Sequence, residues 1–480
     1  MPKVERVVFL SLVLDLFAFT IPLPLFPRII EWYTKRESSD PSGFLSRTLN
    51  FVSATRGLLY NPTSNPSRWD IVLLGGLMGS VFSMLQWFVS PYIGSLSDKY
   101  GRKRVLLVTM IGNILSALIW VKSTTFASYM LSRVVGGLSE GNVQLAIAIL
   151  SDVSSPATRA KALAHVGIAF AICFCIGPPI GAYFASRPLP PTFTASGIEL
   201  NVYATPALLT LVLLILETIF LAVALPETRG KRAHPTSDAK EAKSARSSNG
   251  QSDVPSKGAT VDKKPATVEE RLSLLKVLRR LHFLFLGVFS GVEFTLTFLT
   301  FDLFDWNNKQ NGALIGSIGV ISALLQGGYV RRAIPKVGEG VMARRGISSC
   351  ALGLVLLSAV PPLATTRTFA AVALLRGAAV CLAFTSATVV NSLTSYASLQ
   401  CDEAVDEDTG KPVEEHPELA KGKALGQFRS SGQLGRALGP LLACASYWTF
   451  GPAVTYAVSA VAMFVLSTGM KSIAVKKVAS

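Results

Sequence analysis

The sequence predicts an all-α membrane protein with twelve transmembrane helices arranged as two pseudo-symmetric halves of six. Half of its 480 residues are apolar and 16% are charged, whereas a soluble domain has about 25% charged residues. Apolar stretches long enough to cross a hydrocarbon core of about 30 Å recur along the whole chain. A polar segment separates two blocks of such stretches, and this spacing predicts the two halves.

Each span is placed by its apolar run. The first half is expected to cross the membrane at Val7–Phe26, Asp70–Ile93, Val105–Lys122, Phe126–Leu150, Ala162–Ala185 and Ala204–Leu225, and the second at Leu281–Phe304, Ala313–Val330, Gly346–Ala364, Phe369–Leu393, Ala424–Trp448 and Pro452–Met470. The first run is too long for a cleaved signal, so we expect it to be a retained helix. The predicted domains are therefore residues 1–226 and 281–480.

Residues 227–280 are expected to form a disordered, basic cytosolic linker. The segment is rich in Ser, Lys, Ala and Pro and has too few apolar residues to build a core. Its end, ERLSLLKVLRRL, has the apolar spacing of a helix. We expect this end to form a short helix on the membrane surface before the seventh span.

The distribution of Lys and Arg predicts the orientation. With both termini in the cytosol, most of the 46 basic residues fall in cytosolic segments, as the positive-inside rule requires. The net charge of +16 therefore reflects topology, and we expect no nucleic-acid partner. The plasma membrane and an internal membrane remain alternatives. We expect the chain to work as a monomer, in contact with lipid, without a cofactor or a metal ion.

An internal repeat supports the two halves. The segment 125–133, which starts Thr-Phe-Ala and ends in Arg, recurs at 368–376. Lys161-Ala-Leu and Gly177-Pro recur as Lys423-Ala-Leu and Gly439-Pro. The fourth and fifth spans thus correspond to the tenth and eleventh. Two parallel halves of six helices are typical of transporters, whose substrate site lies between the halves near the midplane.

Several motifs resemble the major facilitator superfamily. Between the second and third spans, GSLSDKYGRK resembles the GxxxDRxGRR signature of that family, and it places Gly94, Asp98, Gly101, Arg102 and Lys103 at the signature positions. LPET at 225–228 resembles the usual end of the family's first half. The resemblance covers nearly the whole chain and implies alternating access by two rocking halves.

Other motifs are similar to particular branches of the family. GPPIG at 177–181 resembles the fifth-helix motif of drug:proton antiporters, although Ala164, Cys173 and Ala182 stand where that motif has further glycines. The second-half copy of the loop signature, at 329–332, lacks the acidic residue. SEGNV at 139–143 and SGVEFTLTFLT at 290–300 look most like the eukaryotic tetracycline-transporter-like branch, which the resemblance links to organic anions.

Charged residues within the spans are the candidate substrate and proton-coupling residues, because each costs at least about 2.5 kcal/mol to insert. They are Asp15, Arg133, Glu140, Glu293 and Arg376. They fall in the first, fourth, seventh and tenth spans, which the resemblance places around a central cavity. The acids can bind a proton or a cation, and the arginines can hold an anionic group. The alternative is a set of structural ion pairs between helices.

Three other groups of residues have narrower expectations. The resemblance implies that Asp98 pairs with a neighbouring Arg and a helix terminus to latch the two halves. Breaks in the backbone hydrogen bonding and close helix contacts are expected at Gly177, Pro178, Gly181, Gly439 and Pro440. Glu217 is expected to pack or to snorkel, since its helix is peripheral in the family.

Arg429 and Arg436 lie seven residues apart and share one face of their helix. They are expected to add positive potential to the cavity, with snorkelling to the cytosolic edge as the alternative for Arg429.

The predicted function is secondary active transport. The chain has no GxxxxGK[ST] loop for ATP and no HExxH or GxSxG motif, so we expect neither an ATP-driven pump nor an enzyme. We expect the substrates to be small organic molecules, either organic anions or drug-like amphiphiles, with transport coupled to protons. A carrier for facilitated diffusion and a non-transporting receptor or scaffold are the alternatives.

Overall fold

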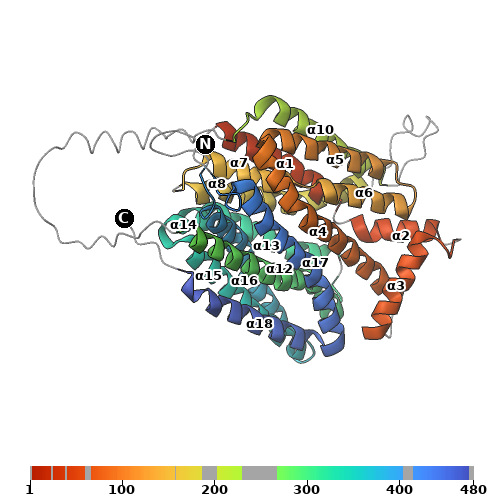
Figure 1. Cartoon of the computed structure of the whole chain (residues 1–480). Coiled ribbons are helices and arrows are strands. Elements are labelled where there is room, and N and C mark those ends of the chain that lie inside the picture. Colours follow the sequence, from red (N-terminus) through yellow and green to blue (C-terminus); the bar gives the residue numbers. More distant parts are fainter. Residues whose placement is uncertain are drawn as a thin grey trace, which may run out of the picture.

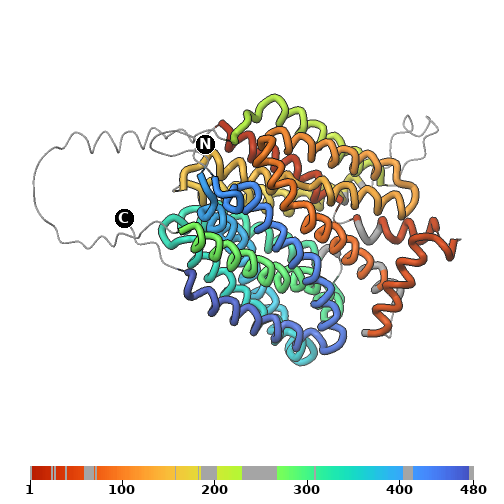
Figure 2. The backbone as a smooth tube through the Cα atoms, in the orientation of Figure 1, coloured from red at the N-terminus to blue at the C-terminus, as the bar shows by residue number. Residues whose placement is uncertain are grey.

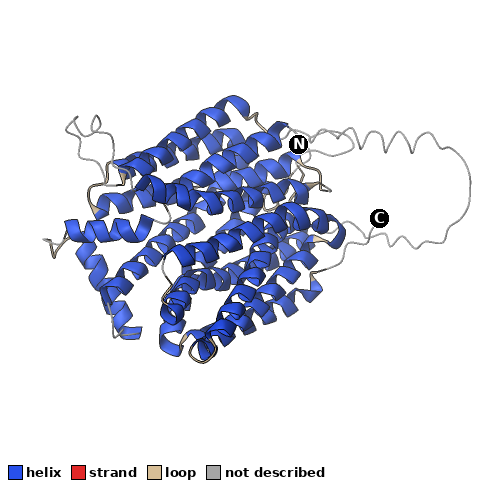
Figure 3. Ribbon diagram, turned by 180° about the vertical axis from the view of Figure 1, so that it is seen from behind, coloured by secondary structure: helices blue, strands red, loops and turns tan. Residues whose placement is uncertain are grey.

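The computed structural model describes residues 3–22, 25–37, 40–59, 66–156, 158–185, 203–229, 267–306, 308–403 and 415–474. Within these ranges the regular structure is helical and contains no strand (Figure 3). The helices run side by side along the bundle, with the first half of the chain against the second (Figure 1). The all-helical membrane fold is therefore confirmed. Most of the expected linker, at residues 230–266, lies outside the described ranges.

The first half contains α1 (Lys3–Thr20), α2 (Phe26–Arg36), α3 (Phe44–Leu59), α4 (Pro66–Tyr100), α5 (Arg102–Val121), α6 (Phe126–Ser139), α7 (Asn142–Val153), α8 (Arg159–Ala185) and α10 (Ala204–Ala224). The second half contains α12 (Val268–Phe304), α13 (Asn308–Leu324), the π-helix η2 (Leu325–Val330), α14 (Arg331–Val337), α15 (Glu339–Ala364), α16 (Thr368–Ser398), α17 (Lys421–Phe450), α18 (Pro452–Gly469) and the short η3 (Met470–Ser472).

Ten helical stretches in the described ranges are long and apolar enough to cross a membrane. The two expected spans outside this set are α1 and α17. Each carries charge: α1 contains Lys3, Glu5, Arg6 and Asp15, and α17 contains Lys421, Lys423, Arg429 and Arg436. A helix that packs inside a bundle and faces polar groups can hold charges that a lipid-facing helix cannot.

Two sequence expectations were wrong in detail. The first helix ends at Thr20 instead of Phe26, because Pro22 follows and cannot continue the hydrogen-bond ladder. The predicted fourth span is divided into α6 and α7 at Glu140 and Gly141, whose backbone is not helical. Between the first and second spans the chain forms two further helices, α2 and α3.

The expected surface helix is also corrected. Helix α12 begins at Val268 and continues to Phe304, so ERLSLLKVLRRL forms the first turns of the seventh span rather than a separate helix. A capping box fixes this start: the Thr267 side chain accepts from the Glu270 amide, and the Glu270 side chain accepts from the Thr267 amide. No proline or glycine interrupts the chain between the polar turns and the apolar turns.

Buried apolar side chains form two large clusters. One lies between Val7 and Leu225, and the other lies between Leu275 and Met470. The two halves meet along α4 and α17, with further contacts of α8 against α13 and α16. Helix α1 begins, and α18 finishes, at the same end of the bundle (Figure 2). We call this end the termini end.

Candidate binding cavity and contacts between the halves

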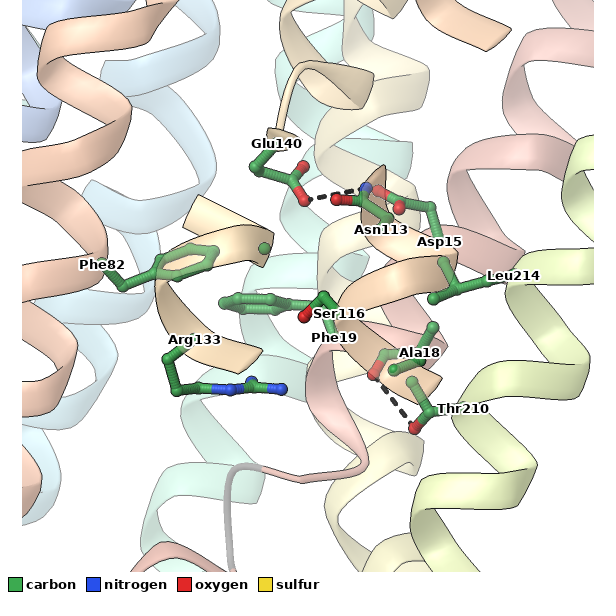
Figure 4. A pocket seen from close by; sticks show the side chains of 12 residues that line it. Asp15, Ala18, Phe19, Phe82, Asn113, Ser116, Arg133, Glu140, Thr210 and Leu214 are labelled. Atoms are coloured by element: carbon green, nitrogen blue, oxygen red, sulfur yellow. Dashed lines mark hydrogen bonds between the residues drawn. The ribbon is translucent and has the colours of Figure 1, made fainter. Parts of the chain in front are cut away.

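A cavity lies beside α1 in the first half (Figure 4). Five helices and the α6–α7 break supply its lining, which consists of Asp15, Ala18, Phe19, Phe82, Asn113, Ser116, Ala117, Arg133, Gly136, Glu140, Thr210 and Leu214. The cavity therefore contains three of the five charged residues predicted from the sequence: Asp15, Arg133 and Glu140.

The two acids of the cavity are held by asparagine amides. The Nδ2 of Asn142 donates to Oδ1 of Asp15 at 2.6 Å, and the Nδ2 of Asn113 donates to Oε2 of Glu140 at 3.4 Å. Because the helix is broken at Glu140, this residue lies in irregular backbone that faces the cavity instead of lipid. Sequence reasoning missed both asparagines, although amides in apolar spans are a signal for contacts between helices.

Arg133 lies at the other end of the cavity from the acids, with Phe19 and Phe82 between them (Figure 4). Its guanidinium is 5.5 Å from the ring centre of Trp120 and 5.4 Å from that of Tyr129. These are cation–π distances, so the two rings stabilise the charge, and no carboxylate among the described residues forms an ion pair with it. Along the cavity, the cation of Arg133 is followed by two aromatic rings and then by two acids. The cation suits an anionic group of a ligand, and the rings suit its apolar body.

The second half supplies opposite charges from α17. Arg429 interacts electrostatically with both Glu140 and Asp15 of the first half. About two turns further along α17, Arg436 interacts with Glu293 of α12. Arg429 and Arg436 thus share a face of α17, as their spacing predicted, and Arg429 faces acids of the other half instead of snorkelling to the edge.

Glu293 and Arg376 do not line the cavity described above. The Glu293 side chain is exposed midway along the membrane part of α12, with Arg436 as its charged neighbour. Arg376 is exposed on α16, and no ion pair between described residues includes it. The structure thus brings Asp15, Arg133 and Glu140 together, places Arg436 as the charged neighbour of Glu293, and leaves Arg376 apart.

At the termini end, Asp98 joins the two halves. Its carboxylate accepts from the first amides of α17, with Oδ1 at 2.9 Å from the nitrogen of Gly422 and Oδ2 at 2.7 Å from that of Lys423. Oδ1 is also 2.7 Å from Nη1 of Arg102 and 3.3 Å from Nη1 of Arg229. A carboxylate at a helix N-terminus satisfies free amides and complements the helix dipole.

The other residues of the signature support Asp98. Arg102 is buried and uses separate nitrogens for Asp98 and for Asp152, the latter through Nε at 2.9 Å. Gly101 has φ of +99°, a conformation that favours glycine, and it directs the chain into α5. The Nζ of Lys103 donates to the carbonyl of Ala222 at 2.8 Å, which ties α5 to α10.

An ion network extends from Asp152 across the interface. Lys421 of α17 is 3.5 Å from Asp152 and 2.6 Å from Glu403, and Glu403 is 2.6 Å from Arg159 of α8. Lys421 and Arg159 are almost fully buried. Outside the membrane-spanning helices, burial also raises the pKa of Glu415, which is 3.5 Å from Arg229. Sequence reasoning missed this network, because none of its members belongs to a motif.

Close backbone contacts between helices explain why glycine occupies several positions. A Cβ on Gly94 would collide with the carbonyl of Gly422, and a Cβ on Gly422 would collide with that of Gly94, so α4 and α17 touch through backbone. In the same way a Cβ on Gly181 would meet the carbonyl of Ile21, and one on Gly439 would meet that of Gly287.

The predicted motifs at Gly177, Pro178 and Gly181 and at Gly439 and Pro440 thus lie where helices approach closely, within helices that continue past each proline.

Two helical halves, a charged cavity in the first half whose acids interact with Arg429 of the second, and a closed contact between the halves at one end are features of a membrane carrier. A profile of the Major Facilitator Superfamily matches residues 8–406. The mouse protein called major facilitator superfamily domain-containing protein 10 is 32% identical over 464 residues, covering 97% of this chain and 91% of the relative. The human protein of that name is 33% identical, covering 94% and 88%. The chain therefore belongs to the major facilitator superfamily and is a secondary transporter of the membrane.

Two solved structures and one protein that matches a shorter part of the chain are also similar. The crystal structure of the human organic anion transporter MFSD10 (TETRAN) is 29% identical and superposes with a TM-score of 0.76, covering 98% of this chain and all of that one. The proton:xylose symporter XylE, at 12% identity and a TM-score of 0.64, shares the fold over 98% of this chain and 96% of its own. The quinolone resistance protein NorA of Staphylococcus aureus is 32% identical over 120 residues, 24% of this chain and 31% of that protein.

The similarity to the tetracycline-transporter-like branch and to drug transporters, expected from the motifs, is confirmed.

Proposed function

We propose that the protein transports small amphipathic organic anions by alternating access and couples this transport to protons. The observation that carries the proposal is the position of Arg429. It belongs to the second half and interacts with Asp15 and Glu140 of the first. An anion that binds between the halves can replace Asp15 or Glu140 as the partner of Arg429. The acid that loses Arg429 then binds a proton, because a buried carboxylate without a partner would be costly. Anion and proton thus bind together.

The cavity supports this class of substrate. The cation–π site at Arg133 and the rings of Phe19 and Phe82 can hold an anionic group and an apolar body. The solved human relative is described as an organic anion transporter. Both halves belong to one chain, so a monomer contains the complete transport unit.

We place the termini end in the cytosol, in agreement with the Lys and Arg distribution. In this state the cytosolic side is closed by Asp98 and the network around Lys421. Opening that end while closing the other would complete the cycle. The proposal covers either the plasma membrane or an internal membrane.

The test is transport by purified protein in proteoliposomes. The probes are radiolabelled p-aminohippurate and naphthalene-2-sulfonate, two aromatic anions. We expect saturable exchange at equal pH and accumulation when a pH gradient is imposed in one of its two directions. Exchange without accumulation would indicate facilitated diffusion. Flux equal to that of empty vesicles for both probes would contradict transport of organic anions and favour the scaffold alternative.

Variants then assign the charges. Arg429→Gln should weaken exchange of both anions at least tenfold, and Arg429→Lys should restore part of it, because the charge remains. Asp15→Asn and Glu140→Gln identify the coupling acid, because these are the two acids that interact with Arg429. The variant that removes it should keep exchange at equal pH, since exchange needs only the loaded carrier to alternate, and should lose accumulation.

A further inference from the structure

A third acid, Glu217 of α10, lies close to the cavity but outside its lining. Its side chain is 1% exposed, and its Oε2 has no hydrogen-bond partner among the described residues. From the sequence we expected Glu217 to pack or to snorkel. Burial excludes snorkelling, because a snorkelling side chain carries its charged group to water. A buried polar atom without a partner costs free energy, so it requires an explanation.

The position of Glu217 follows from the face of α10 on which it lies. Thr210 and Leu214 line the cavity, and Glu217 follows them at the i+7 position of the same face. The hydroxyl of Thr210 is 3.5 Å from the carbonyl of Ala18, which sets the register between α1 and α10. The two helices run in opposite directions. At 1.5 Å per residue, Glu217 therefore lies roughly 6 Å nearer the termini end than Asp15.

The charges around Glu217 do not compensate a carboxylate. Asp15 of α1 and Glu140 both interact with it, and both are acidic. On the other neighbours of α10, the ammonium of Lys103 is held by the carbonyl of Ala222, and the ring of His165 bonds the carbonyl of Ala162 in its own helix. A second or third negative charge in this buried group would be costly, and a carboxyl group avoids the cost by binding a proton.

We propose that Glu217 is a proton-binding residue that receives the transported proton from Asp15 and Glu140 and releases it to water when the termini end opens. In each transfer one proton moves to Oε2 of Glu217 and leaves one carboxylate behind on the donor, so charge is conserved. The cavity has a volume of about 60 Å³, enough for about four waters at the 10–15 Å³ that each needs. Water there can connect the cavity acids to Thr210 and Leu214, the latter less than one turn before Glu217 on the same face of α10. The inference depends on the proton coupling in the proposed function.

The test compares Glu217→Gln with the parent protein in the proteoliposome assay. Gln keeps the shape and removes the titration. We expect exchange of p-aminohippurate at equal pH within twofold of the parent and accumulation driven by the pH gradient reduced at least tenfold. The matched control is Thr218→Val, which changes the neighbouring residue, whose hydroxyl bonds the carbonyl of Leu214 within its own helix. This control should leave both activities unchanged.

The outcomes separate this inference from the proposed function. A parent protein that shows exchange but no accumulation overturns proton coupling itself. A coupled parent with an equally coupled Glu217→Gln variant overturns only the role of Glu217. Equal loss of exchange and accumulation in a folded Glu217→Gln protein indicates a structural residue and also overturns it.

A second measurement decides the question if Glu217→Gln does not fold or if neither probe is transported. Infrared spectra of the parent and of Glu217→Asp are compared at neutral pH in water and in deuterium oxide. We expect a protonated-carboxyl band in the parent, and we expect it to change frequency in Glu217→Asp because the acid that holds the proton has changed. An identical band in the two proteins, or no such band in the parent, would overturn the proposal.

Discussion

Asp98 allows a quantitative prediction, because its partners among the described residues are defined. Its two oxygens receive the amides of Gly422 and Lys423 and the guanidinium groups of Arg102 and Arg229. In Asp98→Asn the new NH₂ group faces a donor, so one backbone amide of α17 loses its acceptor at a cost of about 1–3 kcal/mol. Loss of the negative charge at the N-terminus of α17 adds about 0.3–1 kcal/mol. The closed termini end should therefore be destabilised by about 3 kcal/mol.

That free energy corresponds to a shift of about 100-fold in the equilibrium between the closed and open forms, since about 1.4 kcal/mol gives tenfold. The cavity residues are untouched. We therefore expect slower turnover in proteoliposomes with a substrate affinity within threefold of the parent. Spin labels at the exposed positions Lys99 and His416, one in each half, should show a longer distance populated in Asp98→Asn.

The control is Asp40→Asn, because the Asp40 side chain accepts only from the amide and hydroxyl of Ser42, two residues further on, among the described residues. It should change neither turnover nor the distance between labels. An Asp98→Asn protein with greatly weakened binding and normal turnover at saturation would refute the reasoning. So would an unchanged distance distribution.

Three further predictions concern the same end of the protein and the linker. Gly422→Ala should slow turnover at least tenfold, because its Cβ would collide with the backbone of Gly94. Gly327→Ala, which has open space around it, should behave like the parent, and equal rates in the two variants would contradict the backbone contact. Arg102→Lys should lower the melting temperature in detergent, because one ammonium cannot replace the separate bonds to Asp98 and Asp152, each worth about 1.5–3 kcal/mol. An unchanged melting temperature would argue against a stabilising role of these two bonds. Deletion of residues 231–264, which keeps the cap at Thr267, should leave expression and flux intact, because the segment has too little apolar sequence for a core, and loss of either would reveal a structural or regulatory role.

Much of the fold could be predicted from the sequence, because its signals are local. A run of about 20 apolar residues indicates a span wherever it occurs, and the repeat of Thr-Phe-Ala with its Arg at 133 and 376 indicates two related halves. The same local signals gave wrong limits for three of the predicted helices. Pro22 ended the first helix early, and Glu140 with Gly141 divided the fourth span, whereas the polar turns after Thr267 joined the seventh.

The partners of the charged residues were decided only by the tertiary structure. The sequence indicated that Asp15, Glu140 and Arg133 belong to one site, but it could not show that Asn142 and Asn113 bond the acids or that Arg429 faces them from the other half.

The same holds for Glu217 and Lys421. The rotation of each helix about its axis and the register between α1 and α10 place one side chain beside the cavity and the other in the closed interface. Rotation and register depend on the packing of residues far apart in the chain, including the glycine contact between α4 and α17, and no stretch of sequence contains that information by itself.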